Sequence, residues 1–395
     1  MMTNGFLVTT DHSILDRAED IMRYRSWYGY RICYMGELAL LYCPVNDHDS
    51  DDILDDILIH GFMYNGMGNY SYVSINDDTI TFARDPLGCK PLYYEYSDGI
   101  SIVSDRRVLN KPNTVRQGYK YTYRLKSKEL MIEEHQRLMY KPSDVSMEDA
   151  ITKVESILKY IMSITCNDRI MVGVSGIDST VLASIASEYT DVKSVTVCVK
   201  DSYDYSNSEH ELFVVDEDDI IDSLRNLESA GMPIRGGNIM HTSIACIVSI
   251  LAGHAKRSGY GTIMLGQLAD ELFAGYARYI RYHRVYGDGL NEILFNDVMN
   301  AEGDLIRDDT AASPYTALIL PYAFHILAEY AVNLPLHLKI NGGIRKFILR
   351  KVAERIGMPP RTSYREKKAM QFSSGIYRMV KNIMHHYHYD KNNNQ

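Results

Sequence analysis

The chain has 395 residues, of which 46% are apolar and 24% are charged, and its formal net charge is −9. This composition is typical of a globular protein and excludes a disordered chain, and the length exceeds what one hydrophobic core usually serves, so two domains are expected. The acidic balance argues against nucleic acid as the main partner, because a nucleic-acid site needs a basic face.

Six cysteines are scattered without a CxxC pair or a metal-ligand spacing. We therefore expect free thiols in a reducing compartment, with Cys198 and Cys246 as small core residues. The N-terminus lacks a basic segment followed by a long apolar one, and the apolar run 241–255 is too interrupted for a clean membrane span. We expect a cytoplasmic protein without a signal peptide or a membrane partner.

About the first 140 residues contain short segments rich in Tyr, Ile and Val, separated by Asn, Asp, Gly and Pro. Such segments predict β-strands, here at 29–43, 69–75, 79–84, 92–96 and 99–104. The acidic run from Asp47 to Asp56 is expected to be a solvated loop that leads into a helix.

The pattern changes after Asp144. Ser146, followed by Glu148 and Asp149, predicts a capped helix that runs to about Thr165. Strands and helices then alternate, which favours a parallel sheet with helices on both faces. Strands are expected at 169–174, 193–199 and 262–265, helices from 178, at 218–229 and at 241–258, and a mostly helical part from about 310.

The stretch 172–180 reads Val-Gly-Val-Ser-Gly-Ile-Asp-Ser-Thr and joins a strand to a helix. Unpaired N–H groups and the positive helix end would face a phosphate there. Gly176 permits close approach of the backbone, and Ser175 and Ser179 add donors. Asp178 could hold a magnesium ion that bridges phosphates. No Gly-Lys-Ser/Thr follows, so this is not a Walker A loop. A plain strand-to-helix turn with a Ser or Asx cap explains the same residues.

A second polar stretch, 266–276, follows the apolar run 262–265. Its paired carboxylates, Asp270 and Glu271, lie where a strand of an open α/β sheet ends, which suits a metal or a substrate amine. The alternative is the acidic first turn of a helix, which is stabilising by itself.

Two basic stretches, 345–350 and 365–368, concentrate cations in an acidic chain. A basic helix face explains the first equally well. The second runs into Ser373-Ser374-Gly375 and is less easily explained as surface. A Lys or Arg near a departing pyrophosphate would neutralise charge that develops in the transition state.

These segments, in this order, resemble the asparagine synthetase family, which joins a class II glutaminase domain to an ATP-pyrophosphatase synthetase domain. The family's Ser-Gly-Gly-x-Asp-Ser loop resembles 174–179, and its Gly-x-Gly-Ala/Ser-Asp-Glu-x-Phe-Gly-Gly-Tyr segment resembles 266–276. Its Lys-x-x-Leu-Arg helix resembles Lys346–Arg350, and its Arg-x-Lys stretch resembles Arg365–Lys367. The run 83–94 resembles the Ala-Arg-Asp-Pro-x-Gly-x-x-Pro-Leu-Tyr-Tyr segment of class II amidotransferase domains.

The resemblance implies an α+β, Ntn-hydrolase-like sandwich over residues 1–141, with a degenerate amidotransferase site. Over residues 142–395 it implies an α/β parallel-sheet ATP-pyrophosphatase domain, of the adenine nucleotide alpha hydrolase type, with a helical C-terminal part. The implied cofactors are ATP and Mg²⁺, with Asp178 and Asp270 holding the metal and with Lys367 and Glu271 as catalytic residues. The implied contacts to ATP and pyrophosphate are Val172, Ser175, Gly176, Asp178, Ser179, Gly266 and Lys346.

Several positions depart from the family. Met2 and Thr3 stand where the family has its N-terminal nucleophilic Cys, so glutamine hydrolysis is expected to be absent. Val174 and Ser175 replace a Ser and a Gly of the phosphate loop, and Leu268 replaces the second Gly of the Gly-x-Gly segment. The family's Glu-x-Arg-x-Pro-Phe-x-Asp stretch corresponds to 317–324, which lacks the Glu, the Arg and the Asp.

The resemblance implies adenylation of a carboxylate by ATP, release of pyrophosphate, and displacement of AMP by an amine. Aspartate is the default carboxylate, and the amine would be free ammonia or would come from a separate amidotransferase partner; a homodimer is equally compatible. The alternative is a catalytically silent relative that acts as a nucleotide-binding or regulatory partner. Retention of Asp178, Asp270 and Lys367 favours the enzyme, because relaxed selection gives no physical reason to keep all three.

Overall fold

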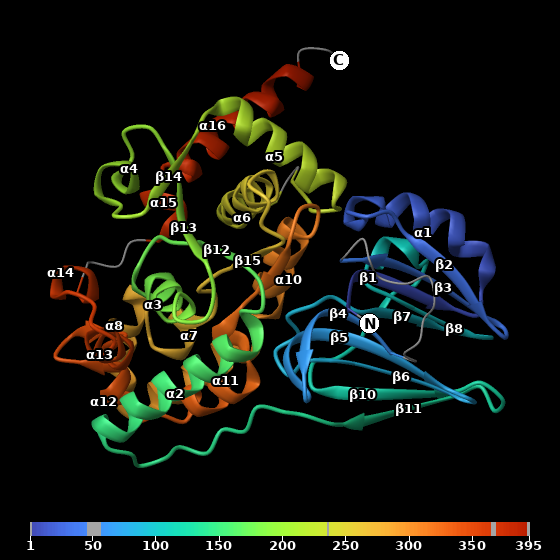
Figure 1. Ribbon diagram of the computed structural model, residues 1–395, viewed down its shortest axis with the longest axis horizontal. Helices are drawn as coiled ribbons and strands as arrows, with labels where there is room; N and C mark the ends of the chain where they lie inside the picture. Colours follow the sequence, from blue (N-terminus) through green and yellow to red (C-terminus); the bar gives the residue numbers. More distant parts are fainter. Residues whose placement is uncertain (1, 46–56, 235–236, 365–368, 393–395) are drawn as a thin grey trace. The chain divides into compact units, whose positions relative to one another are not determined.

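The computed structural model describes residues 2–45, 57–234, 237–364 and 369–392, with side chains up to residue 385 (Figure 1). Its contacts define two compact units. The expected boundary kept all of 142–395 together, whereas segments 299–309 and 323–329 pack in the first unit. Periodicity in the sequence reveals an element but not the core into which it packs. The first unit comprises Met1–Met139, Met299–Asp309 and Ala323–Glu329, and the second comprises Tyr140–Val298, Thr310–Tyr322 and Tyr330–Gln395.

The described strands of the first unit form one hydrogen-bonded sheet that divides into two layers at β1. Along one edge β1 pairs with β3, and along the other its first residues pair with β4 and its last residues with β8. One layer therefore continues through β4, β5, β6, β10 and β11, and the other through β8, β7 and β9. The strands are β1 Met2–Thr9, β2 Arg31–Met35, β3 Leu38–Pro44, β4 Ile57–Tyr64, β5 Met67–Asn76, β6 Thr79–Arg84, β7 Tyr93–Tyr96, β8 Ile100–Val103, β9 Asn113–Thr114, β10 Tyr119–Arg124 and β11 Glu129–Glu134.

The period-two alternation of β1 fills two cores. Phe6 and Val8 pack between the layers, in a cluster that includes Phe82 of β6 and Tyr121 of β10. Leu7 points to the opposite face, where α1 (Leu15–Met22) covers the sheet. The first unit is therefore an α+β sandwich.

Some expected elements of this unit need correction. The segment 29–43 forms two strands, β2 and β3, because Gly36 turns the chain with a φ of 61°. The acidic run 47–56 lies outside the described residues, but the chain continues as strand β4 from Ile57 and not as the expected helix.

The second unit contains a parallel sheet in the order β14-β13-β12-β15-β16. The chain starts in the centre at β12, adds β13 and β14 on one side, and adds β15 and β16 on the other. The carboxyl ends of β12 and β15 thus form a topological switch point, where open α/β sheets bind ligands. The strands are β12 Ile170–Gly173, β13 Val192–Val199, β14 Glu211–Val215, β15 Thr262–Met264 and β16 Ala317–Ile319. The short strand β16 interrupts the part of the chain that was expected to be mostly helical from about 310.

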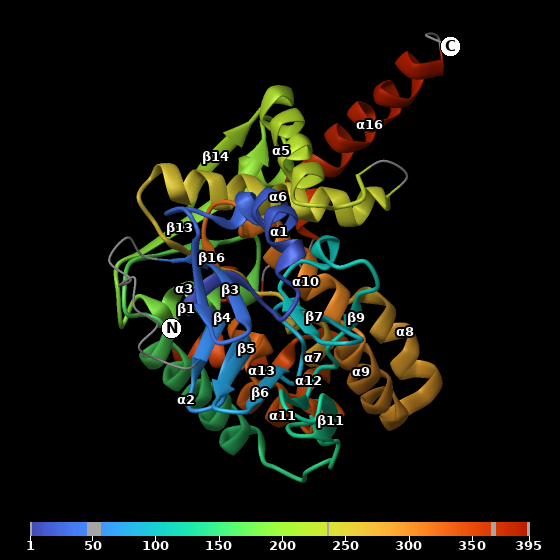
Figure 2. The ribbon, with the colours of Figure 1, turned by 90° about the vertical axis from the view of Figure 1, so that its right-hand side faces the viewer.

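Helices cover both faces of this sheet. Helix α3 packs with α2 and α13 against one face, and α6 packs with α5, α15 and α16 against the other (Figures 1 and 2). The helices that carry the unit are α2 Met147–Thr165, α3 Ile177–Ala186, α4 Tyr203–Asn207, α5 Glu217–Ser229, α6 Ile239–Arg257, α7 Ala269–Leu272, α8 Ala277–Tyr286, α9 Leu290–Met299, α12 Leu336–Lys339, α13 Phe347–Arg355, α14 Pro360–Ser363, α15 Met370–Ser373 and α16 Ile376–Asn392. Two further helices, α10 Glu302–Ala312 and α11 His325–Val332, and the hairpin of β17 Ile340–Asn341 and β18 Ile344–Arg345 complete the chain.

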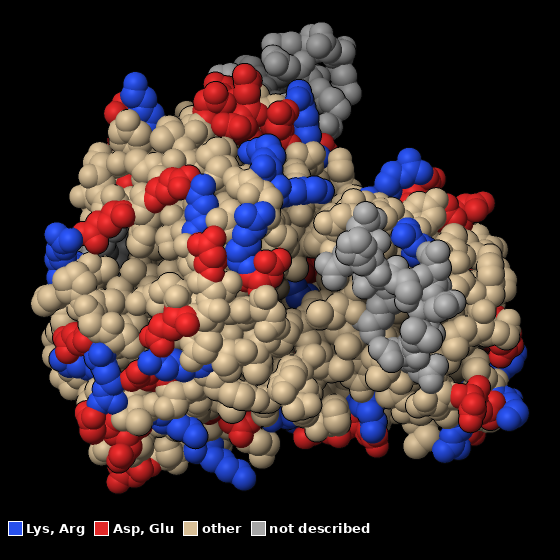
Figure 3. Space-filling model, viewed as in Figure 1, with Lys and Arg blue, Asp and Glu red and all other residues tan. Residues whose placement is uncertain are grey.

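Helix α6 is long and apolar enough to cross a membrane by length and composition alone. However, 67% of its apolar window is buried inside the unit, as in the core helix of a globular domain. On the face shown in Figure 3, Lys and Arg side chains are interspersed with Asp and Glu, so this face presents no continuous basic surface for a nucleic-acid backbone.

Candidate active site

The loop after β12 is braced so that the first turn of α3 faces the end of the sheet. The Val174 N–H donates to Val195 O at 2.8 Å, which continues the sheet pairing beyond β12. The Ser175 N–H donates to the Ser179 hydroxyl at 3.2 Å, and that hydroxyl donates to Gly176 O at 3.2 Å. The first N–H groups of α3 have no partner within the helix and are therefore available to an anion.

The loop after β15 packs directly against the first loop. A Cβ on Gly266 would lie 3.0 Å from the Asp178 Cβ and 3.1 Å from the Ser179 nitrogen, so a larger residue would separate the loops. Tyr322 supports the first loop from the core, where its hydroxyl donates to Asp178 O at 3.0 Å. This aromatic is one of the two residues retained from the family's altered 317–324 stretch.

Lys346 joins the two loops. Its ammonium forms an ion pair with the Asp178 carboxylate and a second one with Asp270 Oδ1 at 2.8 Å. The Lys346 side chain is fully buried at the start of α13. A Cβ on Gly275 would overlap the Asp270 carboxylate and the Lys346 side chain, so glycine is required at that position. The structure thus brings together three residues that the sequence identified separately.

The backbone around this cluster is unusual. Leu268, Ala274 and Lys346 all adopt left-handed conformations, with φ of 76°, 54° and 56°. The family pattern has Gly at the first two of these positions, which relieves such strain. A non-glycine residue with this backbone costs roughly 1–2 kcal/mol, so surrounding contacts hold the chain in this shape.

Glu271 is a buried carboxyl beside the cluster. Burial raises its pKa to about 7, although the Tyr276 hydroxyl donates to Glu271 Oε1 at 2.6 Å and favours the ionised form. The Arg278 guanidinium lies over the Tyr276 ring at 4.7 Å from its centroid. Sequence reasoning missed the role of Tyr276, although it is the last residue of the quoted 266–276 segment.

The remaining expected site residues divide into four groups. Val172 is fully buried inside β12, which removes its side chain from contact with a ligand. Ser175 and Gly176 line a pocket, whereas Ser179 is buried and braces the loop. Lys367 lies outside the described residues.

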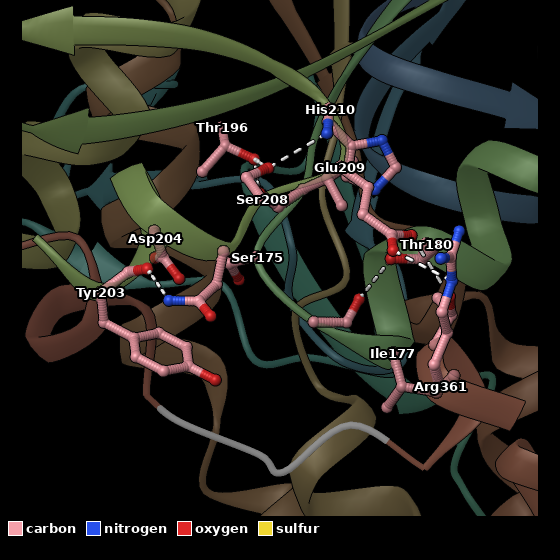
Figure 4. A pocket seen from close by; sticks show the side chains of 14 residues that line it. Ser175, Ile177, Thr180, Thr196, Tyr203, Asp204, Ser208, Glu209, His210 and Arg361 are labelled. Carbon is pink, nitrogen blue, oxygen red and sulfur yellow. Dashed lines mark hydrogen bonds and ion pairs between the residues drawn. The ribbon is translucent and has the colours of Figure 1, made fainter.

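The pocket has a volume of about 230 Å³, and Figure 4 shows the side chains that line it. Its walls come from the loop, the segment around α4 that leads into β14, and α14. The lining residues are Val174, Ser175, Gly176, Ile177, Thr180, Thr196, Tyr203, Asp204, Asn207, Ser208, Glu209, His210, Arg361 and Thr362. The members from α4 onward were not predicted, because no local motif marks them.

The carboxylate pair of Asp178 and Asp270 fits a magnesium ion that also binds nucleotide phosphates. Magnesium in such sites takes one or two protein carboxylates, and phosphates and water supply the other ligands. The described residues contain no group of three or more His, Cys, Asp and Glu side chains suited to a metal. Asp178 and Asp270 could supply two ligands of a magnesium ion, and phosphates and water would supply the others.

The first unit has a buried ionic cluster of its own. Asp309 accepts a hydrogen bond from Lys90 Nζ at 2.6 Å and lies 3.6 Å from Arg25 NH1. Burial opposes ionisation of Asp309, but the neighbouring cations outweigh it and lower its pKa to about 2. Burial also lowers the pKa of His60, 3.4 Å from Asp309, to about 3. His60 is therefore neutral at neutral pH and contributes no charge.

The first unit presents no activated thiol among its described residues. Cys33, Cys43 and Cys89 are free, and burial raises the pKa of each of them. Thr3, at the start of β1, is 1% exposed, and its hydroxyl donates to Ile59 O at 3.3 Å.

The second unit is thus a parallel α/β domain of the class that binds ligands at a topological switch point, with charged loops at that point. Comparison with protein families identifies it further. The model of the asparagine synthase family matches residues 174–315 and 288–393, together more than half of the chain. The chain belongs to the asparagine synthase family.

A relative from Methanocaldococcus jannaschii carries the name "Putative asparagine synthetase (glutamine-hydrolyzing) 1". It is 24% identical over 425 residues, which cover 89% of this chain and 78% of the relative. Among solved structures, the U34-tRNA thiolase NcsA from Methanococcus maripaludis aligns over 63% of this chain and 80% of its own, with 13% identity and a TM-score of 0.29. The allosteric regulatory enzyme of purine biosynthesis aligns over 53% and 68%, with 11% identity and a TM-score of 0.28.

Proposed function

We propose that this protein is an ATP-dependent amide synthetase that forms AMP and pyrophosphate. The observation that carries this proposal is the meeting of Asp178, Asp270 and Lys346 at the switch point of the parallel sheet. Family membership supports the reaction class, and the geometry supports these residues as its charged centre.

In the first step, a carboxylate oxygen of the substrate attacks the α-phosphorus of ATP, and pyrophosphate leaves with the electrons of the broken P–O bond. Ser175 and Gly176 offer donors to the phosphates at the start of α3. In this proposal Lys346, which forms ion pairs with two carboxylates, shifts to the phosphate oxygens when ATP binds. A magnesium ion held by Asp178 and Asp270 would neutralise phosphate charge. Lys367 is proposed to stabilise the departing pyrophosphate.

In the second step, an amine attacks the acyl carbon of the adenylate and AMP leaves. The attacking nitrogen must lose a proton. Glu271 is a candidate acceptor, because its pKa near 7 allows it to gain and lose a proton at neutral pH. Tyr276 holds one oxygen of this carboxyl in place.

The amine is proposed to be ammonia from solution or from a separate amidotransferase partner. In this proposal the first unit is an Ntn-hydrolase-like, class II amidotransferase-like domain without the thiolate that glutamine hydrolysis needs. Its buried Thr3 and its raised thiol pKa values support this. Aspartate is the proposed carboxylate and the cytoplasm the proposed compartment.

The test is pyrophosphate release from ATP and Mg²⁺, with aspartate and ammonium present or withheld. Aspartate-dependent release in the wild type, lost in Asp178→Ala, supports the proposal. The exposed variant Asp222→Asn, on α5, controls for the loss of an unrelated acidic side chain. If no carboxylate that is tried leads to pyrophosphate release, the proposal that this protein is an enzyme is refuted.

A second candidate function is a catalytically silent, nucleotide-binding partner. It is favoured by Ala317, which begins β16 where the family has a Glu, and by Leu268 and Ala274, which occupy backbone shapes suited to Gly. ATP binding measured by calorimetry, in the absence of any pyrophosphate release, would identify this function.

A further inference from the structure

The pocket beside the phosphate loop is lined by a set of residues that does not include Lys346. Asp178, Asp270 and Lys346 do not line it, whereas residues of the β13–β14 connection and of α14 do. In the view of Figure 4, Ser175 lies between Asp204 and Arg361, which both line the pocket. A ligand seated on the loop can therefore be contacted from two directions.

The character of the pocket favours a phosphate group over an apolar one. Among the described residues that line it, Val174 and Ile177 have aliphatic side chains, Gly176 has none, and the others carry hydroxyl, amide, imidazole or charged groups. A Cβ on Gly176 would meet nothing within 4 Å, so the backbone there is open to a ligand. The opening coincides with the positive end of α3, which has ten residues.

One cation in the pocket is held loosely. The Arg361 Nε lies 3.3 Å from Glu209 Oε1, and these side chains are 77% and 51% exposed. Thr362 donates to the other oxygen of Glu209 at 3.3 Å. An exposed ion pair of this kind contributes little stability, so the guanidinium can exchange its carboxylate for another anion. Guanidinium binds phosphate oxygens through two parallel N–H groups.

We propose that Arg361 is a phosphate-binding residue of this pocket and that Glu209 is its competing counter-ion. In the ligand-bound protein, Arg361 leaves Glu209 and contacts the pyrophosphate portion of the nucleotide seated on the start of α3. The inference rests on the proposed function for the identity of the ligand, but it concerns binding and needs no turnover. It adds a contact outside the loop motif and outside the Lys346 cluster.

The pocket contains side chains of both charges, so the effect of removing each one tells whether the ligand is an anion or a cation. Asp204, which is 2% exposed and accepts from Ser373 at 2.7 Å, and Glu209 are carboxylates in the same pocket. A cationic ligand would use them and would be repelled by Arg361. A phosphate ligand would use Arg361 and would be repelled by Glu209.

The experiment is calorimetric titration of inorganic pyrophosphate into the full chain. Arg361→Ala is expected to weaken binding about tenfold or more, as loss of a charge-assisted hydrogen bond does. Glu209→Gln is expected to tighten it several-fold, because it frees the guanidinium. The matched controls are Arg225→Ala and Asp222→Asn, which break an exposed pair on α5 and leave the pocket unchanged. Thermal melts establish that each variant is folded.

Wild-type affinity in Arg361→Ala overturns the proposal, and so does wild-type protein that binds no pyrophosphate at millimolar concentration. The proposal is also overturned if Arg361→Ala binds pyrophosphate more tightly than the wild type and Glu209→Gln binds it more weakly. That result would assign the pocket to a cationic ligand. Failure of the proposed function can be distinguished from failure of this inference. If only the proposed function fails, ATP releases no pyrophosphate, but the binding of added pyrophosphate still depends on Arg361.

Discussion

Each of the two units buries ionised side chains, but the balance of charge differs. In the first unit, one carboxylate, Asp309, is surrounded by the cations Lys90 and Arg25. In the second unit, one ammonium, Lys346, is shared by the carboxylates of Asp178 and Asp270. The cluster in the second unit has more carboxylates than cations, so it attracts a further cation such as a metal ion. The cluster in the first unit has more cations than carboxylates, so it repels one. The comparison shows why burial of charge alone does not mark an active site.

The largest expected effect tests the shared ammonium. Lys346→Met leaves the buried carboxylate of Asp178 and the partly buried carboxylate of Asp270 without the ammonium between them, which should lower the free energy of unfolding by about 3–5 kcal/mol and abolish pyrophosphate release. Denaturant unfolding measures the first effect. Lys351→Met on the same helix removes a lysine whose partner Glu354 is partly exposed, and it should have little effect. A Lys346→Met variant as stable as Lys351→Met would show that the cluster is not a buried ion pair.

The next largest effect is a difference in pH dependence between the units. Asp309 has a pKa of about 2, below the ordinary value of 3.8. Its stabilisation is therefore present above about pH 4 and is lost as pH falls through 2, roughly 2 kcal/mol in all. Glu271 has a pKa of about 7, above the ordinary 4.5. Its contribution is present below about pH 4.5 and is lost as pH rises through 7, roughly 3 kcal/mol.

Two variants separate these slopes in a plot of unfolding free energy against pH. Asp309→Asn should flatten the plot between pH 2 and 4, and Glu271→Gln should flatten it between pH 5 and 7. Each variant serves as the control for the other. An unchanged slope between pH 5 and 7 in Glu271→Gln would mean that this carboxyl ionises normally in the folded protein.

A smaller effect separates the two sides of the phosphate loop. Gly275→Ala overlaps Asp270 and Lys346 and should cost about 1–3 kcal/mol of stability. Gly176→Ala meets nothing within 4 Å and has an extended backbone, with φ of −169°, so folding should be unaffected. The added methyl group should nevertheless weaken pyrophosphate binding, because it stands where the ligand approaches. Equal melting temperatures for both variants would contradict the packing described for Gly275.

The smallest effect concerns backbone strain. Ala274→Gly should change stability by less than about 1 kcal/mol, because relief of the left-handed backbone offsets the greater entropy of glycine in the unfolded chain. Ala183→Gly in α3 is the matched control and should cost about 1 kcal/mol. If Ala274→Gly lowers stability as much as Ala183→Gly does, the backbone at Ala274 is not strained.

Much of the candidate site could be predicted because its residues lie in short motifs beside strand ends. Asp178, Asp270 and Lys346 were each identified in this way, and the structure brings them together. Arg361 and Glu209 could not be predicted, because each is an ordinary surface charge in its own segment. Their significance depends on the pocket that α14 and the β13–β14 connection form with the loop.

From the sequence alone we could predict the alternation of strands and helices after residue 146, the β-rich first part and the glycine-containing loops, since periodicity and turn chemistry are local properties. Three features became visible in the folded chain: β12 lies beside β15, segments 299–309 and 323–329 pack in the first unit, and Lys346 reaches Asp178 across 168 residues. Buried parallel strands are all rich in the same kinds of apolar residue, so their sequences do not specify which strands are neighbours. Such strands can pair in many orders, and the order is settled by the packing of the whole unit.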